Sequence, residues 1–266
     1  MRKYWLIFKL NLVEAFVYRA TSFIWFFCDF APALVLVIFW VAVFAGKDSI
    51  AGFSLADMLL YYFGVMIIST VIIPHPAPWL AEQIRTGQFA PVYLLKPVSV
   101  FWERLCSQIS WRLIRLLFTV PASILVGYLL QDYLGDFTLP LKRLSILILA
   151  LILSFIGQLF FKICLGLAAI WFGDSFWIIA FWDMLMALLG GAYFPLDIYP
   201  PLVQSISLYL PFRYFFYFPL SIFLGQADSA GLIRGFLWLG FWLIVAGLTY
   251  RLVLTRGIKN YSAFGG

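Results

Sequence analysis

Long apolar runs dominate this chain, and they restrict its fold more than any other feature. Runs long enough to cross a bilayer core of ~30 Å, which takes ~20 helical residues, recur from about residue 23 to residue 254. Hydrophobic residues fill 64% of the 266 positions and charged residues only 11%, whereas a soluble globular protein carries about 25% charged residues. The sequence therefore predicts an all-α polytopic membrane protein and excludes a soluble globule.

Prolines divide the apolar sequence into six predicted transmembrane helices. The run from Pro74 to Pro78 must end or distort the second span, because proline removes a helical hydrogen bond. Five prolines cut residues 193–230 into pieces too short to cross, which predicts two short re-entrant or interfacial helices. Counting residues 212–224 as a crossing gives seven spans, but the charge distribution argues against it. The predicted single domain, 1–266, comprises an interfacial helix at 1–21, spans 1–5 at 22–192, an outer segment at 193–230, span 6 at 231–254 and a tail at 255–266.

The amino-terminal segment is amphipathic. Trp5, Phe8, Leu12 and Phe16 fall on one helical face among four basic residues, a pattern typical of a helix lying in the membrane interface. Apolar residues on its other faces equally allow a helix that is partly buried against the first span.

The segment 81–104 is a charged, turn-rich interruption of the apolar sequence. Glu82 and Arg85 lie three residues apart, and Gly87 can end a short helix with a positive φ. Two prolines then prevent a long helix, and a second helix is expected to restart near Ser99. The segment is either a compact surface that another protein grips or an ordinary cytoplasmic loop.

Basic residues in short loops orient membrane proteins, because they are retained on the cytoplasmic side. Six spans place five basic residues on one side and twelve on the other, where both termini and the 81–104 segment lie. Both termini are therefore expected to be cytoplasmic. The twelve are Arg2, Lys3, Lys9, Arg19, Arg85, Lys96, Arg104, Arg112, Arg115, Arg251, Arg256 and Lys259; the five are Lys47, Lys142, Arg143, Arg213 and Arg234.

Lys162 lies inside the fourth predicted span, and Asp183 lies inside the fifth. Both are roughly 15 Å from the turn that joins these spans, at a rise of ~1.5 Å per residue. Because isolated charges are costly at that depth, we expect an ion pair or a shared polar cluster. Such a pair either fixes helix register or lines a pathway. Asp29, in the first span, is a third intramembrane polar candidate.

Several kinds of chemistry have no signature in this sequence. A phosphate-binding GxxxxGK[ST] loop and a GxSxG motif are absent, and His75 is the sole histidine, which excludes a His-pair metal site or a His-based triad within one chain. We expect no ATP hydrolysis, no cofactor, no metal and no nucleic acid. Gly231 and Gly235 form a lone GxxxG, a weak signal for helix contact. The cysteines show no pairing rhythm and are expected to be reduced; they are Cys28, Cys106 and Cys164.

Four stretches together carry a family resemblance: IRTGQFAPVYLLKPVS (84–99), GAYFPLDIYP (191–200), LPFRYFFYFPLSIFLG (210–225), and the terminal Tyr261, Phe264, Gly265 and Gly266. In this order and topology the chain resembles the membrane permease subunits of type-2 ABC exporters, particularly the six-span branch with a short loop after the second span. The resemblance covers essentially the whole chain, although no single stretch is as specific as a Walker sequence.

The resemblance implies a coupling helix that docks on a cytoplasmic ABC ATPase subunit, present in two copies, which would hold ATP and Mg. It also implies pairing with a second copy or a related permease, contact with membrane lipids, and a place in the bacterial inner membrane. The expected coupling residues are Glu82, Gln83, Ile84, Arg85, Thr86, Gly87 and Gln88. The candidate aromatic residues of the pathway wall are Trp25, Phe26, Tyr61, Tyr62, Trp177 and Trp182.

Two other classes of protein remain open at this stage. An intramembrane lipid-modifying enzyme needs polar residues that converge in one leaflet, and the chain offers Asp29, Asp183, Lys162 and His75. An ion-coupled secondary transporter is expected to show inverted repeats, and no convincing repeat is visible. An ATPase that purifies with the chain distinguishes the exporter from both.

Overall fold

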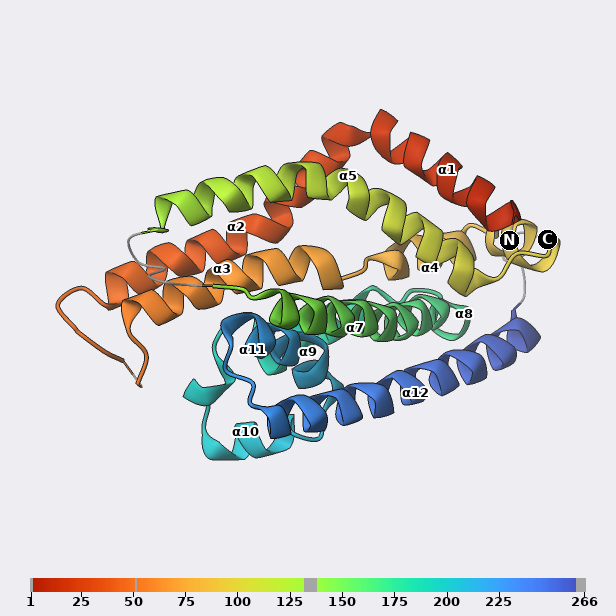
Figure 1. Cartoon of the computed structure of the whole chain (residues 1–266). Helices are drawn as coiled ribbons and strands as arrows, with labels where there is room; N and C mark the ends of the chain where they lie inside the picture. The colour runs from red at the N-terminus through yellow and green to blue at the C-terminus, as the bar shows by residue number, and fades with distance from the viewer. Residues whose placement is uncertain (1, 51, 132–137, 262–266) are drawn as a thin grey trace.

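The computed structural model describes residues 2–50, 52–131 and 138–261, apart from the side chains of Asp29 and Ala33. Regular structure in these residues is helical, with one isolated bridge between Ile50 and Phe53. Most of the polar turn expected between residues 131 and 140 lies outside the described residues. The helices form an elongated bundle in which the long elements run close to one axis (Figure 1). The prediction of an all-α membrane protein is confirmed.

Five helical segments are long and apolar enough to cross a membrane among the described residues, and they contain α2, α3 with α4, α5, α7 with α8, and α12. The fifth predicted span is only the 14 residues of α9, so the six-span count stays a prediction. In chain order the elements are α1 (Arg2–Val17), α2 (Arg19–Val43), α3 (Leu55–Ile72), α4 (Pro76–Arg85), η1 (Ala90–Leu94), α5 (Val100–Leu129), α7 (Leu141–Leu167), α8 (Ala169–Phe172), α9 (Phe176–Leu189), η2 (Leu196–Ile198), α10 (Pro201–Ser207), η3 (Arg213–Tyr217), α11 (Phe218–Leu224) and α12 (Ser229–Asn260).

Local sequence explains where several helices begin and end. Ser54 and Asp57 form a capping box at the start of α3: the Asp57 amide donates to Ser54 Oγ over 3.2 Å, and the Ser54 amide donates to Asp57 Oδ2 over 2.9 Å. Helix α3 then ends before Pro74, and α4 begins with Pro76 in its first turn, where proline is tolerated. The predicted break in the second span is therefore confirmed.

Helix α1 packs against α5. One of the two interpretations had expected it to pack against the first span instead. The Ser110 hydroxyl donates to the Phe8 carbonyl over 3.1 Å, and the chain bends at Tyr18 before α2 begins. The helical restart at Ser99, within the 81–104 segment, creates this partner, because α5 then runs back past the amino-terminal helix. The opposite face of α1 is apolar and open, with Leu10 70% exposed, as an interfacial helix requires.

The proline-cut outer segment forms part of the core. Phe215 and Phe216 of η3 and Leu220 of α11 are fully buried against α3 and α7, whereas Leu202 of α10 is 72% exposed. A Cβ added at Gly157 of α7 would lie 2.5 Å from the Phe215 ring, so this glycine permits the close approach. The two short elements predicted here differ in role, since one inserts between long helices and the other stays at the surface.

Gly235 of α12 permits a similar close contact with an aromatic ring, and replacing this glycine tests the packing of α12 on α11. A Cβ at Gly235 would lie 2.0 Å from the Phe218 ring, whereas nothing lies within 4 Å of a Cβ at Gly240. We expect Gly235→Ala to destabilise the fold by about 1–3 kcal/mol through overpacking. The matched control, Gly240→Ala, should be neutral or stabilising, because alanine favours helix. Apparent melting temperatures of the detergent-solubilised variants measure both; equal values for the two would contradict the assigned contact.

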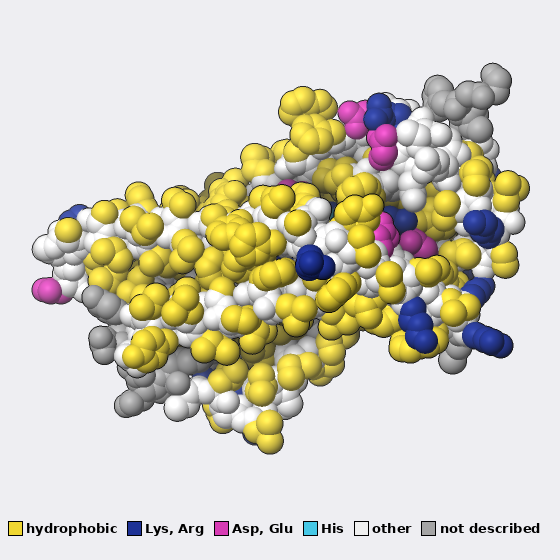
Figure 2. Space-filling model, turned by 90° about the horizontal axis from the view of Figure 1, so that it is seen from above, with side chains coloured by type: hydrophobic (Ala, Val, Ile, Leu, Met, Phe, Trp, Pro, Cys, Tyr) yellow, Lys and Arg dark blue, Asp and Glu magenta, His cyan; other side chains and the backbone are white. Residues whose placement is uncertain are grey.

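Both described ends of the chain lie at one end of the bundle, which we call the basal end (Figure 1). The Ser99 amide donates to the Tyr4 hydroxyl over 3.2 Å, and the rings of Phe89 and Tyr261 are 5.3 Å apart. The 81–104 segment thus shares an end with both termini, as the charge pattern predicted. Charged side chains gather toward this end, while hydrophobic side chains cover most of the rest of the visible face (Figure 2). The opposite, distal end carries the α2–α3 and α11–α12 turns.

Candidate functional site

Helix α4 at the basal end has one buried face and one open face. Its buried face packs on α7 so closely that a Cβ at Gly166 would lie 2.8 Å from the Ala77 carbonyl oxygen. On the open face, Arg85 donates to Glu82 over 2.6 Å, and the two side chains are 65% and 48% exposed. Trp79 is 65% exposed, and Leu95 beyond η1 is 79% exposed. Aromatic residues and arginine are enriched at protein–protein interfaces, so the exposed Trp79 and Arg85 suit this surface to contact with another protein.

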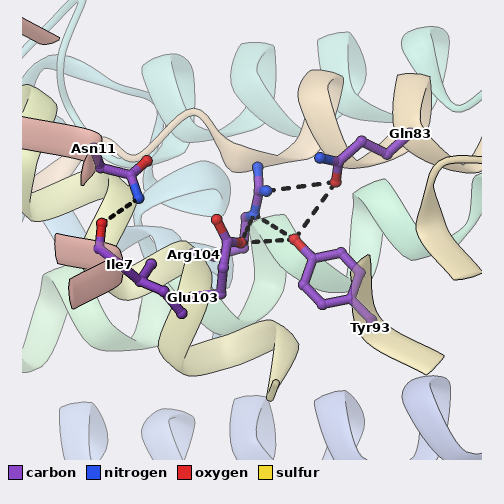
Figure 3. Close-up of polar contacts among 6 residues, drawn as sticks. All are labelled: Ile7, Asn11, Gln83, Tyr93, Glu103 and Arg104. Atoms are coloured by element: carbon purple, nitrogen blue, oxygen red, sulfur yellow. Dashed lines mark hydrogen bonds and ion pairs between the residues drawn. The ribbon is translucent and has the colours of Figure 1, made fainter. Parts of the chain in front are cut away.

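A buried polar network joins α4 to η1 and α5 (Figure 3). The Tyr93 hydroxyl donates to Glu103 Oε2 over 2.6 Å and accepts from Arg104 Nε over 3.0 Å. Arg104 also pairs with Glu103, and its Nη2 donates to Gln83 Oε1 over 3.4 Å. Burial raises the pKa of Tyr93 well above its ordinary value, so the phenol remains a neutral donor. Because charged partners in a buried network resist separation, α4, η1 and the start of α5 are held together.

A second set of contacts bridges the break between α3 and α4. Arg112 of α5 donates from Nε to the Thr70 carbonyl over 3.0 Å and from Nη2 to the Ile73 carbonyl over 2.8 Å. The His75 amide donates to Gln108 Oε1 over 2.9 Å. The proline-rich stretch frees backbone groups that a continuous helix would satisfy, and two side chains of α5 take them instead. We call these contacts the α5 clamp.

The predicted coupling residues occupy four different environments. Ile84 is buried in the core, and Gln83 belongs to the network with Arg104. Gly87 adopts a φ of 73° and ends the helical segment, as predicted. The remaining four are exposed and form the open surface available to a partner: Glu82, Arg85, Thr86 and Gln88.

The predicted ion pair in the membrane is present. Lys162 Nζ contacts Asp183 Oδ1, with the lysine side chain 1% exposed and the aspartate side chain 44% exposed. The pair therefore joins α7 to α9 with its acidic side reaching the surface of the chain. Asp29, the third polar candidate, has its side chain outside the described residues.

The aromatic candidates for a pathway wall also divide by exposure. Tyr61 donates to the Gly191 carbonyl, and Tyr62 donates to the Tyr193 carbonyl over 2.7 Å, so these two buried residues hold the turn after α9. Their role visible in this chain is structural. Phe26 is buried, Trp182 stacks on Phe161 with ring centroids 4.8 Å apart, Trp25 is 41% exposed and Trp177 is 78% exposed.

Sequence reasoning overlooked a polar groove of about 420 Å³ beside the network. It opens between α1, α2, α4 and α5, and it brings His75, Gln83 and Arg104 to one surface. The groove could not be predicted from one stretch of sequence, because its lining residues come mainly from four helices. The three-residue spacing of polar positions in α4 and in α5 did indicate that each of these helices has a polar face. The other lining residues of the groove are Asn11, Glu14, Trp25, Trp79, Glu82, Gln88, Glu103, Ser107, Gln108, Trp111 and Arg115.

These observations define a multi-pass α-helical membrane protein in which α4, a helix with one polar and exposed face, lies at one end of the bundle. The family model described as ABC-2 family transporter protein matches residues 30–265, so the chain belongs to this family. Membership makes it a transport component that works with an ABC ATPase subunit. A comparison with curated proteins found no match.

Proposed function

We propose that this chain is the transmembrane permease subunit of an ABC exporter. It forms half of a translocation pathway, and a separate cytoplasmic ATPase subunit drives it through α4. One observation carries this proposal: α4 presents Glu82, Arg85 and Trp79 outward at the basal end while its opposite face is packed into the bundle. A helix attached on one side and open on the other is suited to transmit a push.

The contacts of α4 determine where such a push goes. Close packing at Gly166 passes movement to α7, and the network around Arg104 passes it to α5. The α3–α4 joint lacks helical hydrogen bonds at residues 74–76, so α3 can remain in place while α4 tilts. ATP binding in the partner thereby becomes a movement of α4, α7 and the start of α5 relative to α3, while the α5 clamp keeps residues 108–112 of α5 attached to the end of α3.

A second copy of the chain, or a related permease, supplies the other half of the pathway. Support comes from α9, whose Asp183 side chain is 44% exposed and whose Trp177 is 78% exposed. A carboxylate on a lipid-facing surface is costly, so this face suits a partner helix or a water-filled path. Two permeases then require two ATPase subunits.

Co-purification tests whether an ABC ATPase subunit works with this chain. The chain is purified from its native membrane, the ABC ATPase subunit is identified by mass spectrometry, and its ATP hydrolysis is measured. We expect Arg85→Glu to reduce retention of the ATPase at least tenfold, because it places two like charges on the open face. Arg143→Glu, a matched charge change near the distal end, should retain it. The proposal fails if no ABC ATPase purifies with the wild-type chain, or if Arg85→Glu and Arg143→Glu behave alike.

A labelling experiment tests the orientation separately. In a variant whose three cysteines are serine, Arg85→Cys should react with a membrane-impermeant maleimide only after the cells are opened. Lys47→Cys, in the turn between α2 and α3, should react in intact cells. The reverse pattern would place α4 outside the cell and contradict coupling to a cytoplasmic ATPase.

A further inference from the structure

A pocket at the distal end has a charge pattern that the transport cycle above does not use. It has a volume of about 250 Å³ and lies between η3, α11 and the start of α12. The lining includes Arg213, Tyr214, Tyr217, Asp228, Gly231 and Arg234.

Two arginines bring positive charge to this pocket. Arg213 Nη1 donates to Ser207 Oγ over 3.1 Å, and its guanidinium lies 5.1 Å from the centre of the Tyr217 ring, so the side chain is held in place. Arg234 enters from the first turns of α12. Arg213 and Arg234 both line this pocket, so their positive charges face the same space. The two cations therefore converge.

One carboxylate in the pocket partly balances the charge of the two arginines. Asp228 lines the pocket, but its Oδ1 accepts from the Gly231 amide over 2.8 Å and caps α12. Two arginines and one aspartate leave the lining with a net charge of +1. Next to Arg234 on α12, Ile233 and Leu237 are 65% and 69% exposed, so apolar surface continues from the pocket along the bundle.

We propose that this pocket binds the phosphodiester group of a membrane phospholipid, with the two arginines as its ligands. Guanidinium groups match phosphate oxygens in bidentate geometry, and a phosphodiester carries the single negative charge that the lining leaves unbalanced. The exposed leucine and isoleucine of α12 then lie beside the acyl chains. The proposal does not depend on the coupling of α4 to an ATPase.

Native mass spectrometry of the delipidated full chain in detergent tests this assignment. Phosphatidylglycerol is the probe, and diacylglycerol and inorganic phosphate are the comparison ligands. We expect the double variant Arg213→Gln/Arg234→Gln to bind phosphatidylglycerol at least tenfold more weakly than wild type. Lys142→Gln/Arg143→Gln is the matched control, because it removes two cations from a different distal pocket and should bind as wild type does.

The other arms separate the possible sources of the phosphate. Weak binding of diacylglycerol and failure of millimolar inorganic phosphate to displace the lipid support a lipid site. Displacement of phosphatidylglycerol by inorganic phosphate would show a site for the free anion and overturn the proposal. Binding of diacylglycerol as tight as that of phosphatidylglycerol would also overturn it. Arg234→Gln alone changes an exposed side chain and should preserve the fold, so it tests the site even if the double variant does not fold. We expect this single variant to bind phosphatidylglycerol about threefold more weakly than wild type. Unchanged binding of phosphatidylglycerol to the single variant overturns the proposal.

Discussion

Asp183→Ala is expected to destabilise the chain by about 3 kcal/mol or more, one of the two largest effects that the structure predicts. The substitution leaves the Lys162 ammonium, 1% exposed, without its carboxylate in the interior of the bundle. Removing one partner of a buried pair costs about 3–5 kcal/mol, because the remaining charge is desolvated and unbalanced. Unfolding in mixed micelles titrated with a denaturing detergent measures the loss.

A double variant separates the two roles left open for this pair. Lys162→Met/Asp183→Leu removes both charges, and such replacements are often neutral or stabilising. We expect its stability to return to within about 1 kcal/mol of wild type. If ATP hydrolysis by the partner is then also normal, the pair only fixes the register of α7 against α9. If hydrolysis or transport falls in this stable variant, the pair belongs to the pathway. A double variant as unstable as Asp183→Ala would contradict the ion-pair account.

Arg112→Met is the second change with a large expected effect. It removes both donors that satisfy the Thr70 and Ile73 carbonyls at the end of α3. A buried polar group left without a partner costs about 1–3 kcal/mol, so two such groups give about 2–6 kcal/mol. Because the clamp also fixes the joint, hydrogen exchange at residues 71–77 should accelerate more than elsewhere in α3 and α4.

Two comparison variants sharpen this result. Arg112→Lys keeps the charge but loses the forked geometry that reaches two carbonyls, so we expect an intermediate loss of stability. Arg251→Met removes an exposed arginine of α12 and should change stability by less than about 0.5 kcal/mol. Exchange that rises uniformly along the chain in Arg112→Met would indicate general destabilisation and not a loosened joint.

Much of the fold follows from rules that act over short distances in the sequence. The prolines around His75 had to end α3, and Gly87 had to end the helical segment that follows. Lys162 and Asp183 were paired by arithmetic alone, because a tight turn between two helices brings residues equally far from it to one level. Charge placed the termini and the 81–104 segment at the same end.

Other features depend on which helix lies beside which, and no local pattern specifies that. The position of α1 on α5 arises from a return of the chain near Ser99, and the amphipathic pattern of α1 fits either neighbour. Arg112 was counted only among the basic residues of one side, because its acceptors are the Thr70 and Ile73 carbonyls, which a break in another helix exposes. Tyr61 and Tyr62 looked suited to a pathway wall, but their hydroxyls bind the backbone after α9.

The shortness of α9 has a consequence for the surrounding bilayer. Its 14 residues measure about 21 Å at a rise of ~1.5 Å each, roughly 9 Å less than the hydrocarbon thickness. A bilayer crossed by a helix of this length would have to become thinner beside it. A thinner bilayer beside α9 would bring the 44% exposed Asp183 carboxylate closer to water, which would lower the cost of a charge on this helix.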